Sequence, residues 1–299
     1  MSLLDFRRSP PQTAAVAAFL QGHSLEVMPR TAAKIPDFRA LLPAGSRVYI
    51  AHIQGTEAHD MVRTALRLRA EGYEPMPHIP ARVIPDRAAL RELVARYRGE
   101  ADVRQALLLG GSPARPAGEF HCAMQLVETG LFSGFERLHV AGHPEGSRDI
   151  DPAGGDAAVM AALRLKAEFA EHCDAAMAIV TQFVFDAGPV IAWERRLRAA
   201  GLRLPVHVGL AGPAKLQTLI KFAVACGVGP SMAVLQRRAR DVTRLVKPFT
   251  PTEVAERLAA HTAADPDSLI EGAHLFPLGG IEAATAWARA QGAHDRREI

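Results

Sequence analysis

The chain has 299 residues, 48% of them hydrophobic, which is enough to bury a large core in two ordinary domains or in one α/β barrel. Its 35 basic and 32 acidic residues are spread along the sequence and leave a formal net charge of +3, so the charge gives little indication of nucleic-acid binding. Three widely separated cysteines, and no apolar run near the ~18 residues of a membrane helix, predict a cytoplasmic protein without disulfides, a metal site or a membrane partner.

Short apolar runs alternate with longer amphipathic stretches, which is typical of repeated βα units on a parallel sheet. Nearly continuous apolar character, as in Ala175–Val180, indicates strands covered on both faces. The runs predict strands at Ser24–Met28, Arg47–Ile53, Glu74–Ile79, Arg104–Leu109, Arg137–Ala141, Ala175–Gln182, Pro205–Gly209 and His274–Leu278. Eight such units indicate a single (β/α)8 TIM barrel.

The amphipathic stretches between these runs predict the helices of the barrel. Asp86 and Pro213 are residue types preferred near helix starts. The predicted helices are Glu57–Glu71, Asp86–Arg98, Gly154–His172, Val190–Ala200, Pro213–Cys226 and Ile281–Gln291.

A long stretch separates the seventh and eighth predicted strands, and extra helices must fill it. Thr252 followed by Glu253 indicates one helix start there. The basic run Arg237–Arg240 is followed by Asp241 and is typical of a solvated helix face. We therefore expect one barrel domain over residues 1–299, with an N-terminal extension at 1–20 and a helical insertion at 227–272.

Glu26 lies among apolar residues on the first predicted strand. Burial there would disfavour its charged form and raise its pKa, as suits a general acid. The alternative is a structural pair with Arg30 or another basic group. The strand by itself leaves both interpretations open.

Polar or flexible residues also follow other strands, where barrel enzymes build their sites. His78 lies between prolines that stiffen the chain, and it is either a pocket residue or a hydrogen-bonded core residue. Gly110 and Gly111 allow a ligand close to the backbone, or form only a tight turn. Neither a GxGxxG fingerprint nor a phosphate-binding P-loop sequence occurs.

Two further residues are suited to a planar ligand. Gln182 ends the sixth strand with an uncharged donor and acceptor, which could read an amide-like ring edge or satisfy only the backbone of the barrel mouth. Phe222 could stack on a ring system or belong to the core.

Several of these segments together resemble the methylenetetrahydrofolate reductase family, from about the first strand to the last. Ser24–Pro29 looks like the family's SFEFFPP pattern, Pro77-His78 like its PH step, and Ala141–Gly146 like its AGYPEGH segment. Thr181–Asp186 is similar to TQFFFD, and His274–Leu278 to HFYTLN.

The resemblance implies a barrel that reduces 5,10-methylenetetrahydrofolate to 5-methyltetrahydrofolate, with hydride passing from NADH or NADPH to FAD and then to the folate. It also implies a homo-oligomer. It makes Glu26 the general acid that protonates the folate nitrogen, with Gln182 at the pterin and Phe222 stacked on the folate. The expected flavin contacts are His78, Gly111, Ser112 and His143, with Lys166 at the diphosphate when a gap is allowed in the comparison.

The chain departs from the family pattern around the flavin. Gly110-Gly111-Ser112 stands where the family carries an Arg/Gly/Asp-like strand end, His143 replaces a tyrosine, and an ungapped comparison puts Glu171 at the diphosphate position. Two versions of the reaction follow, one through FAD and one with direct hydride transfer from NAD(P)H. The reverse oxidation of methyl-folate in a demethylation pathway, and a non-catalytic folate-binding subunit, are the remaining alternatives.

Overall fold

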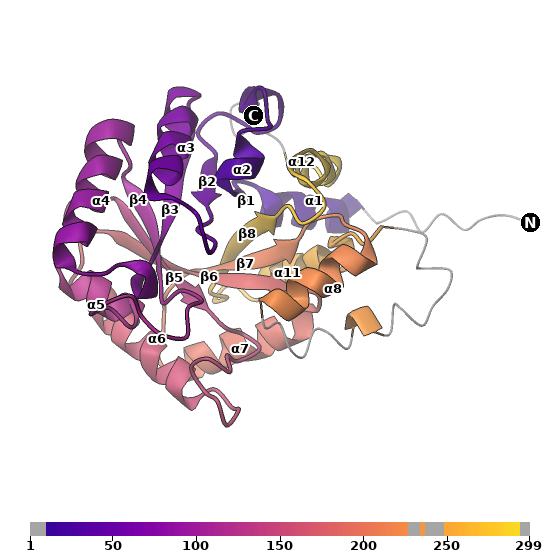
Figure 1. Cartoon of the computed structure of the whole chain (residues 1–299). Coiled ribbons are helices and arrows are strands. Elements are labelled where there is room, and N and C mark those ends of the chain that lie inside the picture. Colours follow the sequence, from indigo (N-terminus) through magenta and orange to yellow (C-terminus); the bar gives the residue numbers. More distant parts are fainter. Residues whose placement is uncertain (1–9, 227–233, 237–247, 294–299) are drawn as a thin grey trace, which may run out of the picture.

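In a computed structural model the chain forms a closed barrel of eight parallel strands with helices around it, which confirms the predicted fold class (Figure 1). The structure describes residues 10–226, 234–236 and 248–293. Each strand pairs with the next one in sequence, and β8 closes the barrel against β1. The strands are β1 (Ser24–Val27), β2 (Arg47–Ile50), β3 (Glu74–Pro80), β4 (Gln105–Leu109), β5 (Arg137–Gly142), β6 (Ala176–Val184), β7 (Val206–Ala211) and β8 (Ile270–Phe276).

The last strand shows the largest difference from the predicted boundaries. It begins at Ile270, which pairs with Val206 of β7, rather than at His274. The exposed Glu271 and the side-chain-free Gly272 interrupt the apolar run, so the sequence pattern hides the start of this strand. The register with β7 also shifts between Val206 and His207.

The helices cover the outside of the barrel and begin close to the predicted positions. Asp86 caps α4, where its side chain accepts a hydrogen bond of 2.8 Å from the backbone N–H of Ala89. The described helices are α1 (Pro10–Leu20), α2 (Pro29–Ala32), α3 (Ala58–Ala70), α4 (Arg87–Ala101), α5 (Ala123–Glu128), α6 (Ala157–Ala170), α7 (Ala187–Ala199), α8 (Leu216–Ala225), α11 (Thr252–Ala264) and α12 (Ile281–Ala290).

Three helix starts differ from the prediction by three residues. Helix α6 begins at Ala157 rather than at Gly154, and α7 at Ala187 rather than at Val190. Helix α8 begins at Leu216 rather than at Pro213. Ala214 instead exchanges two backbone hydrogen bonds with Phe249, and this short antiparallel bridge holds the preceding residues in an extended conformation.

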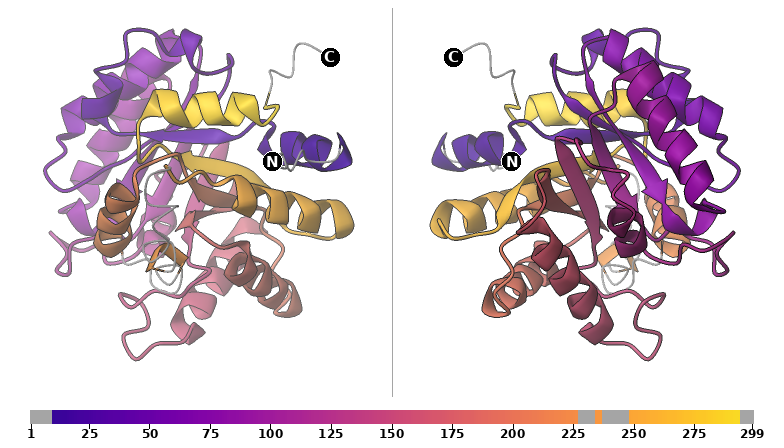
Figure 2. Two further views of the ribbon diagram at one scale, coloured as in Figure 1. Left: turned by 90° about the vertical axis from the view of Figure 1, so that its right-hand side faces the viewer. Right: turned by 90° about the vertical axis from the view of Figure 1, so that its left-hand side faces the viewer.

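The two segments expected outside the repeating units contain helices packed on the barrel. Helix α1 lies beside α11 (Figure 2), and its Val16 and Leu20 are fully buried. In the expected insertion at 227–272, α11 begins at Thr252 as predicted. Residues 1–9, 227–233 and 237–247, including the basic run at 237–240, lie outside the described residues.

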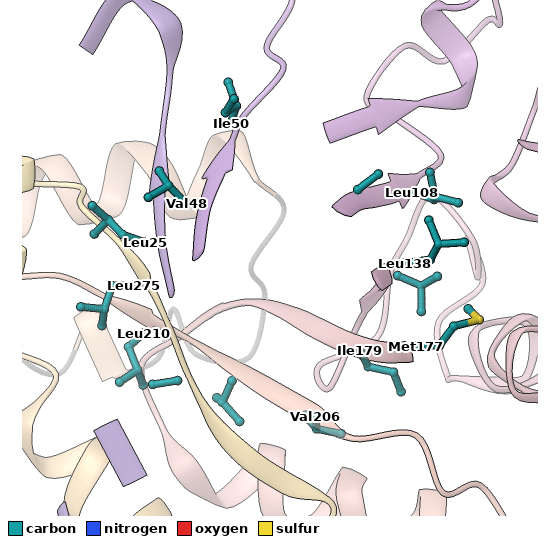
Figure 3. Packing of buried hydrophobic residues seen from close by; sticks show 14 of the residues in the cluster. Leu25, Val48, Ile50, Leu108, Leu138, Met177, Ile179, Val206, Leu210 and Leu275 are labelled. Carbon is teal, nitrogen blue, oxygen red and sulfur yellow. The ribbon is translucent and has the colours of Figure 1, made fainter. Parts of the chain in front are cut away.

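The outward-facing strand side chains form the main core, between the sheet and the helices. Figure 3 shows Leu25, Val48, Leu108 and Leu210 among them, all fully buried. Burying a side chain of this size contributes about 1.5–3 kcal/mol to folding. This layer holds the strands in place and leaves their inward-facing residues to shape the barrel interior.

The barrel interior is more polar than the branched aliphatic filling that is usual for this fold. Because side chains alternate along a strand, Ser24 and Glu26 of β1 share the inward face. Tyr49 of β2 contacts His139 of β5 across the interior. Among the described residues, no helix is both long and apolar enough to cross a membrane.

Candidate active site

A cavity of about 1850 Å³ lies at the carboxyl ends of the strands. Its wall includes every site residue predicted from the sequence, which are Glu26, His78, Gly111, Ser112, His143, Lys166, Gln182 and Phe222. These residues come from three strands (β1, β3 and β6), the loops after β4 and β5, and helices α6 and α8, so the barrel brings them together from most of the chain. Within the part of the chain that the structure describes, no group of three or more His, Cys, Asp or Glu side chains has the arrangement of a metal site.

Glu26 faces two imidazoles at the floor of this cavity. Its Oε2 lies 3.3 Å from Nε2 of His78 on β3 and 3.9 Å from Nε2 of His274 on β8. Burial by itself raises the pKa of Glu26, but the interactions with His274 and His78 outweigh it and lower the pKa to about 2. The predicted increase in pKa is therefore wrong, and Glu26 is paired with basic groups other than Arg30.

His274 has a second partner on its other ring nitrogen. Its Nδ1 lies 2.9 Å from Oγ of Ser24, the residue opposite it in the β1–β8 register. Burial lowers the pKa of His274, and Glu26 only partly offsets this effect, so the imidazole is neutral at neutral pH. The ring of Tyr49 packs on His274 with centroids 4.3 Å apart.

The sequence pattern did not identify His274 as part of the cavity wall, nor Ser24 and Tyr49 behind it. The available signal was the two-residue period of strands, which places Ser24 on the same face as Glu26. His274 could not be recognised in this way, because β8 joins β1 only when the barrel closes.

A strand irregularity directs Gln182 toward the cavity. The register between β6 and β7 shifts between Val180 and Phe183, and Thr181 accepts a hydrogen bond of 2.9 Å from the backbone N–H of Gly209 there. The Gln182 side-chain oxygen accepts a 3.0 Å hydrogen bond from the N–H of Phe183. Its amide nitrogen has no hydrogen-bond partner among the described residues and can donate to a ligand.

Phe222 of α8 lies on the same side of the cavity. It is half-buried and packs against a small apolar cluster that includes Phe183 and Leu219. Its ring therefore has both an attachment to the core and a surface on the cavity. Both functions considered for this residue fit its position.

The loop after β4 approaches the cavity with its backbone. Gly111 has a φ of +91°, a conformation that favours glycine, and a Cβ there would lie 2.9 Å from Cβ of Pro80. Arg82 donates to the backbone oxygen of Pro113 at 3.3 Å and to the Asp149 carboxylate at 2.9 Å. The loop is thus a constrained turn that also lines the cavity.

His143 and Lys166 form a different part of the wall, at the end of β5 and on α6. Burial lowers the pKa of His143 to about 4, with Lys166 adding to the decrease and Asp149 opposing it. Burial also lowers the pKa of Lys166, which has no hydrogen-bond or ion-pair partner among the described residues. A buried amine without a carboxylate is suited to an anionic ligand.

Comparisons with known proteins support the fold. No family model matches the chain. An uncharacterized protein from Clostridium thermocellum that binds two copies of 5-methyl-5,6,7,8-tetrahydrofolic acid superposes with a TM-score of 0.62 and 12% identity, covering 93% of this chain and 97% of that one. The match to a dehydrogenase/reductase from Sinorhizobium meliloti 1021 covers 89% of this chain and 97% of that one at 14% identity, but its TM-score of 0.28 carries no argument. At these identities the first similarity shows a shared fold alone.

Proposed function

We propose that the protein is a methylenetetrahydrofolate reductase-like oxidoreductase, which reduces 5,10-methylenetetrahydrofolate to 5-methyltetrahydrofolate with NADH or NADPH through FAD. The observation that carries this proposal is the position of Glu26 beside two imidazoles on the floor of a cavity that Gln182 and Phe222 also line. The binding of 5-methyltetrahydrofolate by the Clostridium thermocellum protein, which has the same fold, supports a folate as the ligand.

The proposed reaction requires a proton at the folate nitrogen when the methylene bridge opens. Glu26 is a carboxylate in the free protein, because its pKa is about 2. When folate covers the cavity and displaces water, the charged form of Glu26 becomes less favourable, so Glu26 takes up one proton from solvent as the folate binds. Glu26 then donates it to the nitrogen, and the resulting iminium carbon accepts a hydride.

The substrate contacts follow from the same wall. The free amide nitrogen of Gln182 donates to an acceptor on the pterin edge, and the Phe222 ring packs on a flat part of the folate. Holding the folate at both places orients its reacting nitrogen toward Glu26.

Residues of the other wall support the proposal of a flavin dinucleotide. Lys166 supplies a cation without a partner for the diphosphate, and Gly110 leaves the backbone open, since a Cβ there would meet nothing nearer than the backbone oxygen of His121 at 3.9 Å. His143 and Ser112 line the space between them. When bound, FAD would accept a hydride from the nicotinamide and pass it to the folate.

An absorbance spectrum, combined with a turnover assay, tests the cofactor. We expect the purified protein to retain a flavin band after incubation with FAD and desalting, and to oxidise NADH or NADPH when methylenetetrahydrofolate is added. A colourless protein with the same turnover would show direct hydride transfer. A colourless protein that binds folate without turnover would contradict the enzyme and favour a binding subunit.

The substitution Glu26→Gln tests the acid. The amide keeps the shape of the side chain but cannot deliver the proton, so we expect turnover to fall by about 100-fold or more with folate affinity nearly unchanged. The matched control is Glu168→Gln, at an exposed position on α6 away from the cavity. Turnover of the Glu26 variant equal to that of the control would contradict the assignment.

A further inference from the structure

Four buried polar side chains continue from Glu26 into the closed part of the barrel. Ser24, Tyr49, His139 and His274 are each at most 1% exposed. They come from β1, β2, β5 and β8, so they meet only in the interior. Enclosing this many polar groups is costly unless their hydrogen bonds are satisfied, and aliphatic residues would fill the same space without that cost.

These side chains form two hydrogen-bonded pairs. Tyr49 Oη lies 2.5 Å from Nδ1 of His139, and Oγ of Ser24 lies 2.9 Å from Nδ1 of His274. Burial raises the pKa of Tyr49, and hydrogen bonds with Arg47 and Ser24 are among the interactions that oppose the rise. Ser24 and Tyr49 face the interior from adjacent strands, since Tyr49 lies opposite Glu26 in the β1–β2 register, and a hydrogen bond from Tyr49 to Ser24 would join the two pairs into one series.

The direction of the hydrogen bonds follows from the end of this series. Nε2 of His139 is buried and has no hydrogen-bond partner among the described residues. A buried N–H without an acceptor is rarer in proteins than an acceptor without a donor, so we place the proton of His139 on Nδ1. His139 then donates to Tyr49, whose hydroxyl is free to donate to Ser24.

The same direction determines the tautomer of His274. Ser24 uses its hydroxyl proton as donor to Nδ1 of His274, which leaves the imidazole proton on Nε2. That nitrogen faces Oε2 of Glu26 at 3.9 Å. An N–H at this place stabilises the carboxylate, whereas a lone pair would repel it.

We propose that His139, Tyr49 and Ser24 form a hydrogen-bond chain of one direction that fixes His274 with its proton on Nε2 and so orients the side chain of Glu26, which is a carboxylate until folate binds. Ser24, Tyr49 and His139 are positioning residues, because they act on Glu26 only through His274. The tautomer stands independently of the reaction, and its effect on turnover rests on the proposed function.

Nitrogen-15 NMR of histidine-labelled protein at pH 7.5 tests the chain, with His274 and His139 assigned from His274→Gln and His139→Gln variants. We expect the proton on Nε2 in His274 and on Nδ1 in His139. In Ser24→Ala, we expect His274 to become a mixture of both tautomers. A proton on Nδ1 of His274 in the natural protein, a proton on Nε2 of His139, or an unchanged His274 in Ser24→Ala would each overturn the proposal.

Two further variants keep the test valid if Ser24→Ala folds poorly. Tyr49→Phe removes only the hydroxyl and keeps the ring on His274, and we expect it to shift both histidine spectra. Thr285→Ala removes a buried hydroxyl that donates within α12, and we expect both spectra to stay unchanged. If Tyr49→Phe leaves both spectra as in the Thr285 variant, the chain does not exist.

Turnover separates this proposal from the proposed function. If both hold, Ser24→Ala lowers kcat about tenfold, a size typical of groups that orient a reactive residue, with folate affinity nearly unchanged. Expected NMR spectra without any turnover of methylenetetrahydrofolate would overturn the proposed reaction and leave the chain standing. Turnover of methylenetetrahydrofolate by a protein with the opposite His274 tautomer would overturn the hydrogen-bond chain and leave the proposed reaction standing.

Discussion

The two walls of the cavity differ in whether their buried titratable groups keep their charge. On the wall of β1, β3 and β8, Glu26 has two imidazoles beside it and keeps its charge, with a pKa of about 2. On the wall of β5 and α6, burial lowers the pKa of His143 to about 4 and also lowers that of Lys166, and neither has a carboxylate close enough to reverse the effect. A buried group therefore keeps its charge only where the protein supplies interaction partners that outweigh the effect of burial.

This difference suggests a division of roles between the walls. The first wall is complete within the protein, since His78 and His274 accompany Glu26 without any ligand. On the second wall, Asp149 is paired with Arg82 and does not restore the charge of His143, and Lys166 lacks a negative ion-pair partner among the described residues. An anionic ligand at Lys166 would supply it, so we expect the first wall to handle a proton and the second to bind a phosphate-containing cofactor.

The largest effect is expected from removing the cation of the second wall. Lys166→Met keeps the length of the side chain but loses its charge-assisted hydrogen bonds, so we expect FAD or NADH affinity to fall on the order of 50-fold, or about 2.3 kcal/mol. Binding titrations measure it. Arg164→Met, at an exposed position on the same helix, is the control. Equal affinities for the two variants would remove the proposed contrast between the walls.

A smaller effect is expected from crowding the base of the second wall. A Cβ on Gly142 would meet the side chain of Ile179 and lie 3.1 Å from the buried ring of Trp193. We expect Gly142→Ala to lower the free energy of unfolding by about 2 kcal/mol, as measured by urea denaturation. Gly110→Ala is the control because its nearest neighbour would be 3.9 Å away. Equal free energies of unfolding for the two variants would show that the wall accommodates an added methyl group at Gly142 without strain.

The smallest effect concerns a histidine at the far end of the polar interior. His207 stacks on His139 with centroids 5.1 Å apart, and burial lowers its pKa to about 3. Between pH 7.5 and 5.5 the unfolded chain takes up a proton at this histidine and the folded protein does not, so stability falls with pH by about 1.4 kcal/mol for this group.

The substitution His207→Gln should remove that part of the pH dependence. Denaturation at pH 7.5 and 5.5 measures how much the free energy of unfolding falls in the natural protein, in the variant and in a control. The control is His59→Gln, at an exposed position on α3. A loss in the His207 variant as large as in the control would mean that His207 accepts a proton in the folded state. That result would also weaken the view of a closed polar interior.

The strand and helix pattern was accessible from the sequence because local periodicity reports which faces are covered. Ala175–Gln182 was predicted one residue away from the true start of β6. The pattern failed where a long-range pairing decided the structure, as at Ile270 in β8 and at Ala214 before α8. In both places a neighbour distant in sequence supplies the backbone hydrogen bonds.

The amino-acid sequence by itself determined the barrel and the segments that reach its mouth, since apolar runs and strand-end polar residues are local properties. Only the tertiary structure decided the charge of Glu26, because burial and pairing act on a carboxyl in opposite directions and the partners come from other strands. Ser24 and His274, which are 250 positions apart, become neighbours when β8 closes the barrel on β1. The environment of Glu26 is therefore determined by the closure of the barrel.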